Sequence, residues 1–150
     1  MLKSLVKFFE KDTVNNNLSL ENNLTLLTGL MIEAADSDGS ITNEETNKIH
    51  DVLVNTFSED SKDVKKSIEV ALQQRHSSKS LFFFTSKINK IFSNKDKIIL
   101  IEALWEIVLS DGDLHDYESS LIRRLSGLLY VSDIESGNAR KRALSKKKMQ

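Results

Sequence analysis

Apolar residues recur at three- and four-residue spacing along most of the chain, which is the period of amphipathic helices. No stretch shows the alternation of a strand. The pattern therefore predicts an all-α fold, a compact bundle of about seven helices. The predicted helices cover about 20–39, 42–57, 61–75, 81–92, 94–112 and 117–129, with a short one at 2–9 and another after 132.

Local signals mark some helix ends. Thr42 followed three residues later by Glu45 is the signature of a capping box. Asn94 is expected to cap the helix that follows it, because its side chain can accept a backbone hydrogen bond. Gly39 and Gly112 are expected to end the helices before them.

Two segments of the chain repeat at an offset of 73 residues. Each has the form E-x4-D-G-x-[IL]-x3-E. The acidic residues that match are Glu33, Asp38 and Glu45 in the first segment and Glu106, Asp111 and Glu118 in the second. The sequence thus predicts two helical hairpins, each with an acidic turn.

Helical spacing places the four repeated glutamates beside the apolar stripes of their helices, so they are expected to point inward. Bringing carboxylates together inside a protein costs several kcal/mol unless they are hydrated, protonated or neutralised. With no cysteine in the chain, a metal would be held by oxygen or imidazole, and carboxylates suit Ca²⁺, Mg²⁺ or Mn²⁺. We predict that the six residues bind divalent cations. Whether they form one shared site or two is left open by the sequence.

A structural explanation competes with the metal site. Glu45 can be the third residue of a capping box, Asp38 a turn former and Gly39 a left-handed helix terminator. Such a cap does not explain Glu33 or Glu106. His115 lies in the second acidic turn, where it could supply a ligand or cap the next helix.

Composition places further limits on function. The chain carries a net charge of -1, but residues 140–150 hold six basic side chains and no acidic one. Residues 1–139 are therefore acidic, which argues against broad nucleic-acid binding. We expect one domain over 1–139 with its core at about 20–130, then a solvated basic tail over 140–150. The lack of cysteine and of any apolar run long enough to span a bilayer favours the cytoplasm.

The run of Phe82, Phe83 and Phe84 could form a membrane or partner patch. A helix can bury two of three consecutive residues, so core packing is the favoured role for the run.

The segments "IEAADSDGSITNEE" and "LWEIVLSDGDLHDYESSLIRRLSGLL" resemble the TerB-like family, named for bacterial tellurite resistance. The resemblance covers about residues 24–129. It implies a helical bundle in which the acidic D-G turn occurs twice, and whose acidic residues are proposed to bind metal. That role carries over to the six residues above. Asp36 and Asp113 have no acidic counterpart in the other repeat.

The resemblance implies a non-enzymatic, cation-binding interaction module of a bacterial stress response. Its partner is expected to be a protein, including one associated with a membrane. Two alternatives stay open. The acidic turns could be helix caps in a structural adaptor, or the paired carboxylates could serve a metal-dependent hydrolase.

Overall fold

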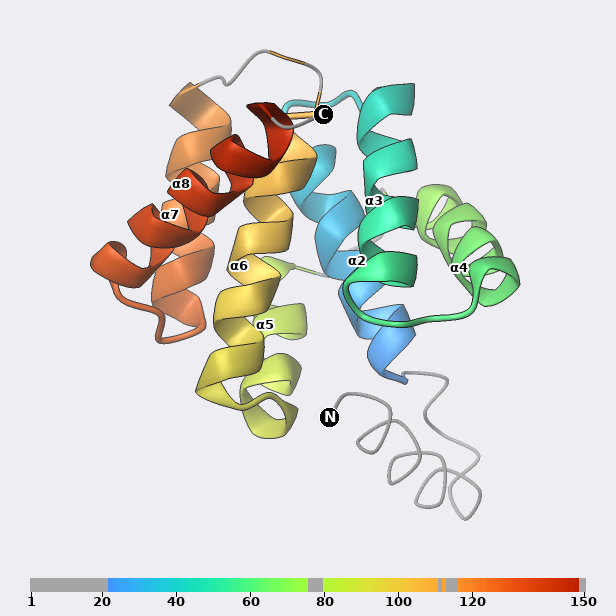
Figure 1. Cartoon of the computed structure of the whole chain (residues 1–150). Coiled ribbons are helices and arrows are strands. Elements are labelled where there is room, and N and C mark those ends of the chain that lie inside the picture. The colour runs from blue at the N-terminus through green and yellow to red at the C-terminus, as the bar shows by residue number, and fades with distance from the viewer. Residues whose placement is uncertain (1–21, 76–79, 111, 113–115, 149–150) are drawn as a thin grey trace.

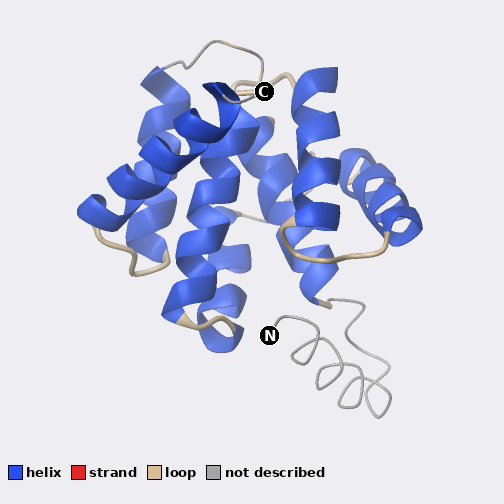
Figure 2. Ribbon diagram, viewed as in Figure 1, coloured by secondary structure: helices blue, strands red, loops and turns tan. Residues whose placement is uncertain are grey.

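The protein is seen here in a computed structural model that describes residues 22–75, 80–110, 112 and 116–148 (Figure 1). Within these residues the chain forms seven α-helices and no strand (Figure 2), which confirms the predicted all-α fold. The helices are α2 (Asn23–Ala35), α3 (Asn43–Asn55), α4 (Ser61–Gln73), α5 (Leu81–Ile91), α6 (Asn94–Val108), α7 (Asp116–Leu128) and α8 (Asp133–Lys148). The short helix predicted at 2–9 lies outside the described residues.

Polar side chains fix the starts of the first five of these helices. The side chains of the N-cap residues accept backbone hydrogen bonds from the first turn, which satisfies amide groups that have no partner within the helix. These caps are Asn22, Thr42, Asp60, Ser80 and Ser93.

Helix α6 begins at Asn94, one residue before the start that a cap at Asn94 would give. The Ser93 hydroxyl accepts a hydrogen bond from the Asp96 amide at 3.2 Å, and Asn94 is already the first helical residue. The prediction that Asn94 caps this helix was wrong by one position. Ser and Asn both cap well, so composition alone did not separate them.

The repeated glycines lie in the turns after the helices and not at the helix ends. Helix α2 ends at Ala35 and α6 at Val108, four residues before Gly39 and Gly112. Both glycines have left-handed backbones, with φ of +93° and +92°. A Cβ at either position would meet no atom within 4 Å, so backbone conformation and not space favours glycine.

The structural repeat is larger than the hairpin predicted from the sequence. Helices α3 and α7 begin at Asn43 and Asp116, 73 residues apart, and α4 and α8 follow them in the same order. Helix α4 packs on α2 and α3, as α8 packs on α6 and α7. The repeat is therefore a unit of three helices, and α5 joins the two copies.

One apolar core runs through both three-helix units. Helices α2 and α6 lie at its centre, and ten residues of α2 and nine of α6 are buried. The units meet where α6 packs against α2 and α3. The covering helices differ, because α4 buries Val64 and Ile68 whereas α8 buries only small residues such as Ala139 and Ala143.

The basic end of the chain forms part of the last helix. Helix α8 continues through Lys148, and Ala143 is only 2% exposed. The helix predicted after residue 132 is therefore confirmed, but the prediction that it is short was wrong. A domain boundary at residue 139 stays a prediction, and α8 crosses that position.

Two glycines inside helices give a matched test of this packing. A Cβ on Gly29 of α2 would lie 2.4 Å from Cε1 of the buried Phe84 ring, whereas one on Gly137 of α8 would meet nothing within 4 Å. We expect Gly29→Ala to lower the free energy of unfolding by about 1–3 kcal/mol through overpacking. Gly137→Ala should raise it by about 0.5–1 kcal/mol, because alanine favours the helix. Urea unfolding measures both changes, and equal stability of the two variants would contradict the close contact of α2 with α5.

Candidate functional site

The first acidic turn joins α2 to α3 and contains Asp36 and Asp38. Asp38 is exposed, and its Oδ1 accepts a hydrogen bond from the Ser40 amide at 3.1 Å, which stabilises the turn. Asp36 is half-buried. Its Oδ1 and the hydroxyl of Ser37 are shielded from solvent and have no hydrogen-bond partner within the described residues. An unsatisfied buried carboxylate oxygen is costly, so this turn can gain from a cation or a bound water.

Glu45 forms the predicted capping box at the start of α3. Its Oε1 accepts hydrogen bonds from the amide and the hydroxyl of Thr42, each at 3.1 Å. The Thr42 hydroxyl in turn accepts one from the Glu45 amide at 3.1 Å. One carboxylate oxygen of Glu45 is thus engaged in a helix cap.

The predicted inward placement of the glutamates is confirmed for three of the four. Glu45, Glu106 and Glu118 are 3%, 9% and 4% exposed. Glu33 is half-buried at the end of α2. Burial of charged carboxylates requires partners, and for Glu106 the structure provides one from the far end of the chain.

Helix α8 supplies that partner. The Lys146 ammonium lies 3.3 Å from Oε1 of Glu106 and also donates a hydrogen bond to Glu102, one turn earlier on α6. Arg142, one turn before Lys146, donates to the other oxygen of Glu102. Two cations of α8 therefore face two carboxylates of α6, where α8 crosses α6 (Figure 1).

Two more basic residues of α8 contact α6. Lys147 donates a hydrogen bond to the carbonyl of Leu109, the C-cap of α6, where a positive charge also complements the helix dipole. The Arg140 guanidinium lies 5.5 Å from the centre of the Trp105 ring, in a cation–π contact. The basic segment thus covers α6 and the beginning of the second acidic turn.

The network shifts two pKa values. Burial alone would raise the pKa of Glu102, but hydrogen bonds and charges from Lys146 and Arg142 outweigh it, and the pKa falls below its usual value. The hydrogen bond to Glu102 raises the pKa of Lys146, and the charges of Glu106 and Glu102 add to this against the effect of burial. At neutral pH the ion pairs are fully formed.

The structure does not gather the five described members of the predicted ligand set into one cluster. Among the described residues, no three acidic or histidine side chains lie close enough to hold a metal ion. An ion at the first turn would therefore need hydroxyl, carbonyl or water oxygens as well as carboxylates. Asp111 and His115 lie outside the described residues, so the complete six-residue set stays a prediction, as does the number of sites.

The contacts of Glu102 with Arg142 and of Lys146 with Glu102 and Glu106 were not predicted from the sequence. Glu102 lies outside the repeat, and the basic segment was expected to be solvated. A signal was present, because Glu102 and Glu106 are four residues apart on one helix and Arg142 and Lys146 match that spacing on another.

These features define an all-helical module with a duplicated acidic hairpin, each copy covered by a third helix. The family model described as "Tellurite resistance protein TerB" matches residues 25–141. The chain belongs to this TerB family, and the match includes both acidic turns and ends within α8. Comparisons with curated proteins and with solved structures gave no match. In the part of the chain that the structure describes, no helix is both long and apolar enough to cross a membrane.

The ion pairs predict a pH-dependent loss of stability in Glu102→Gln. At pH 7 the free energy of unfolding of the variant should be about 1 kcal/mol lower than that of the parent. The effect is small because Arg142 and Lys146, the partners of Glu102, are half-exposed. The pKa of Glu102 is lowered by folding, so its contribution is present above the unfolded value of about 4.5 and is lost as the pH falls through the folded pKa. Urea unfolding from pH 7 downwards should therefore show the full difference at pH 7 and a difference that shrinks as the pH falls below 4.5.

A matched control is Glu69→Gln on α4, where the glutamate is exposed. It should leave stability unchanged within about 0.5 kcal/mol over the same pH range. A Glu102→Gln deficit that does not shrink as the pH falls below 4.5 would contradict the ionic origin of the effect.

Proposed function

We propose that this TerB protein is a non-enzymatic interaction module that takes up a hydrated divalent cation, Ca²⁺, Mg²⁺ or Mn²⁺, at its first acidic turn. The observation that carries the proposal is the buried Oδ1 of Asp36, which has no hydrogen-bond partner among the described residues and lies two residues from the exposed carboxylate of Asp38. A cation between these groups would neutralise both and satisfy the orphaned oxygen.

The chemistry of the turn favours a weak, partly hydrated ion. Hard cations take oxygen ligands, and Mg²⁺ in particular keeps several waters and needs only one or two carboxylates. The hydroxyl of Ser37, also buried without a partner among the described residues, is a further oxygen at the same turn. The second unit is less accessible to an ion, because Lys146 already lies beside Glu106.

A structural adaptor is the second candidate, and two observations favour it. The capping box of Thr42 and Glu45 is complete without an ion, and Glu106 has an ammonium partner. In an adaptor the acidic turns would stabilise helix ends and α8, and partner binding would not respond to metal.

The family description supports a role in resistance to tellurite or related chemical stress. We infer that the protein acts in the bacterial cytoplasm by binding a protein partner. Membrane-associated proteins are among the candidate partners. Catalysis is not part of this proposal. Turnover of generic phosphoesters that disappears in Glu33→Gln or Glu106→Gln would contradict it and favour a hydrolase.

Cation binding predicts a stabilisation that depends on the first turn. Millimolar Ca²⁺, Mg²⁺ or Mn²⁺ added to chelator-treated protein should raise Tm by about 2–4 °C when the ion exceeds its Kd by about tenfold. Calorimetry should give the Kd directly. Asp36→Asn and Asp38→Asn should each remove at least half of the Tm shift, since a neutral amide binds a cation less well.

Asp60→Asn is the matched control. Asp60 is an exposed N-cap of α4, and asparagine caps equally well, so this variant should keep the full Tm shift. If no divalent ion at about ten millimolar changes Tm, or if Asp60→Asn loses as much of the shift as Asp38→Asn, the cation proposal fails and the adaptor takes its place.

A further inference from the structure

One aromatic side chain on α5 is not used by the fold. Phe84 is buried and Phe83 half-buried, which confirms that the helix buries two of the three consecutive phenylalanines. Phe82 remains 66% exposed. Phe82 therefore contributes little to the core. Burial of its ring against a binding partner would be favourable.

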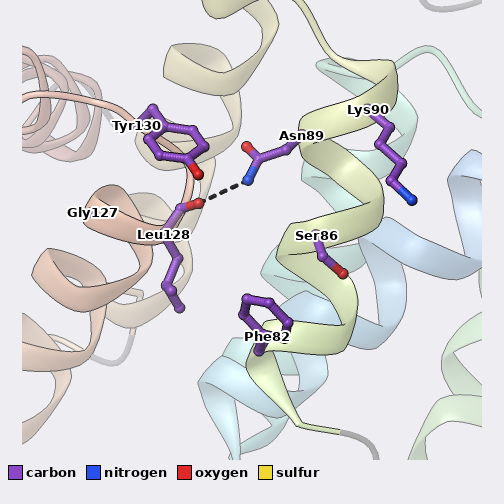
Figure 3. Close-up of a pocket in the computed structure, with 7 residues that line it drawn as sticks. All are labelled: Phe82, Ser86, Asn89, Lys90, Gly127, Leu128 and Tyr130. Atoms are coloured by element: carbon purple, nitrogen blue, oxygen red, sulfur yellow. Dashed lines mark hydrogen bonds between the residues drawn. The ribbon is translucent and has the colours of Figure 1, made fainter.

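Phe82 lies at a hollow between α5 and the end of α7 (Figure 3). The hollow has a volume of about 390 Å³. Its lining residues come from α5 on one side and from α7 and the following loop on the other: Phe82, Ser86, Asn89, Lys90, Gly127, Leu128 and Tyr130.

The two walls of the hollow are joined by a hydrogen bond. The Asn89 side-chain amide donates to the carbonyl of Leu128 at 2.8 Å, as Figure 3 shows. This bond links α5 to α7 across 39 residues of chain. The hollow is therefore held in place before any partner arrives, which lowers the entropic cost of docking.

Tyr130 occupies an unfavourable backbone position on the opposite wall. It follows α7 with φ of +60°, where glycine or asparagine is usual, and the Val131 amide donates to the carbonyl of Ser126 at 2.8 Å to close the helix end. A left-handed backbone costs a non-glycine residue stability. The Tyr130 side chain is 79% exposed, so its packing within the fold contributes little stability to offset the backbone strain.

Basic side chains lie at and beside the hollow, although residues 1–139 carry a net negative charge. Lys90 lines it, and the Lys97 ammonium lies 5.6 Å from the centre of the Tyr130 ring. Arg124 is exposed and lies one helical turn before Gly127 and Leu128, on the same side of α7. None of the seven described lining residues is acidic.

We propose that this hollow is a docking site for an acidic amphipathic helix of a partner protein. A groove between two helices accepts the apolar face of a third, and exposed aromatic side chains at a preformed hollow are typical anchors of an interface. Phe82 and Tyr130 would contact the apolar face of the incoming helix. Lys90, Lys97 and Arg124 would pair with its carboxylates, which selects an acidic helix over a basic one.

A labelled model peptide tests the proposal. The probe is a fluorescent helix of about 16 residues with leucines at helical spacing and glutamates at the other positions. A second probe replaces each glutamate with lysine. We expect saturable binding of the acidic probe by fluorescence anisotropy, falling at high salt, and at least tenfold weaker binding of the lysine probe.

Two variants locate the site. Phe82→Ala and Tyr130→Gly should each weaken binding of the acidic probe by about tenfold. Tyr130→Gly should do so without lowering Tm, because glycine adopts the left-handed backbone without strain. A general loss of structure would instead lower binding and Tm together.

Controls come from the same chain. Tyr117→Ala removes an exposed aromatic of α7 outside the hollow, and Ser58→Gly relieves the other left-handed residue among those described. Both should bind the acidic probe like the parent. Asp38→Asn should also bind it normally, so failure of the cation proposal and failure of the docking proposal give different results.

Several results would overturn the docking proposal. These are no saturable binding of the acidic probe, equal binding of the lysine probe, or parent-like binding by both Phe82→Ala and Tyr130→Gly. A dimer of the parent that Phe82→Ala converts to a monomer, with no binding of the acidic probe, would assign the hollow to a second copy of this chain. Binding to phosphatidylserine vesicles that requires Phe82 and Tyr130, again without probe binding, would assign it to a membrane surface.

Discussion

The ion pair between Lys146 and Glu106 is the interaction on which the C-terminal half of the molecule depends. Glu106 lies in the last turn of α6 and is only 9% exposed, so its carboxylate cannot keep a full hydration shell. Lys146 supplies the opposite charge and shares it with Glu102. Because Lys146 lies near the end of α8, neutralising α6 requires that α8 fold along its whole length.

The two three-helix units cover their central helices with different kinds of side chain. Helix α4 covers α2 with branched apolar side chains, Val64 and Ile68. Helix α8 covers α6 with Ala139, Ala143 and a serine, and small residues let the two helices approach closely. The long basic side chains of α8 then reach α6 from the edges of the contact, with their stems available for packing. The second unit therefore combines small apolar contacts with ion pairs between α8 and α6.

The sequence predicted most helices because their buried residues are large and periodic, as in α3 and α7. Helix α8 gave no such signal, since the residues that it buries are alanine and serine and its exposed residues are charged. The burial of three of the four repeated glutamates, Glu45, Glu106 and Glu118, could be predicted from helical spacing alone. The spacing of Arg142 and Lys146 matches that of Glu102 and Glu106, but spacing does not say which two helices face each other. The contact of Lys146 with Glu102 spans 44 residues and depends on where α8 crosses α6. The orphaned oxygen of Asp36 likewise depends on the turn's three-dimensional shape.

The duplication of a three-helix unit also bears on how such a protein could have arisen. One unit, from the cap of α2 at Asn22 to the end of α4 at Gln73, has 52 residues, near the lower limit for a chain that folds alone. In the present fold each unit leaves part of its central helices to be covered by the other unit. An ancestral gene that encoded a single unit would have produced a polypeptide obliged to pair with a second copy of itself. Fusion of two such genes, with α5 as the added connection, would have turned that homodimer into one chain and freed its halves to diverge.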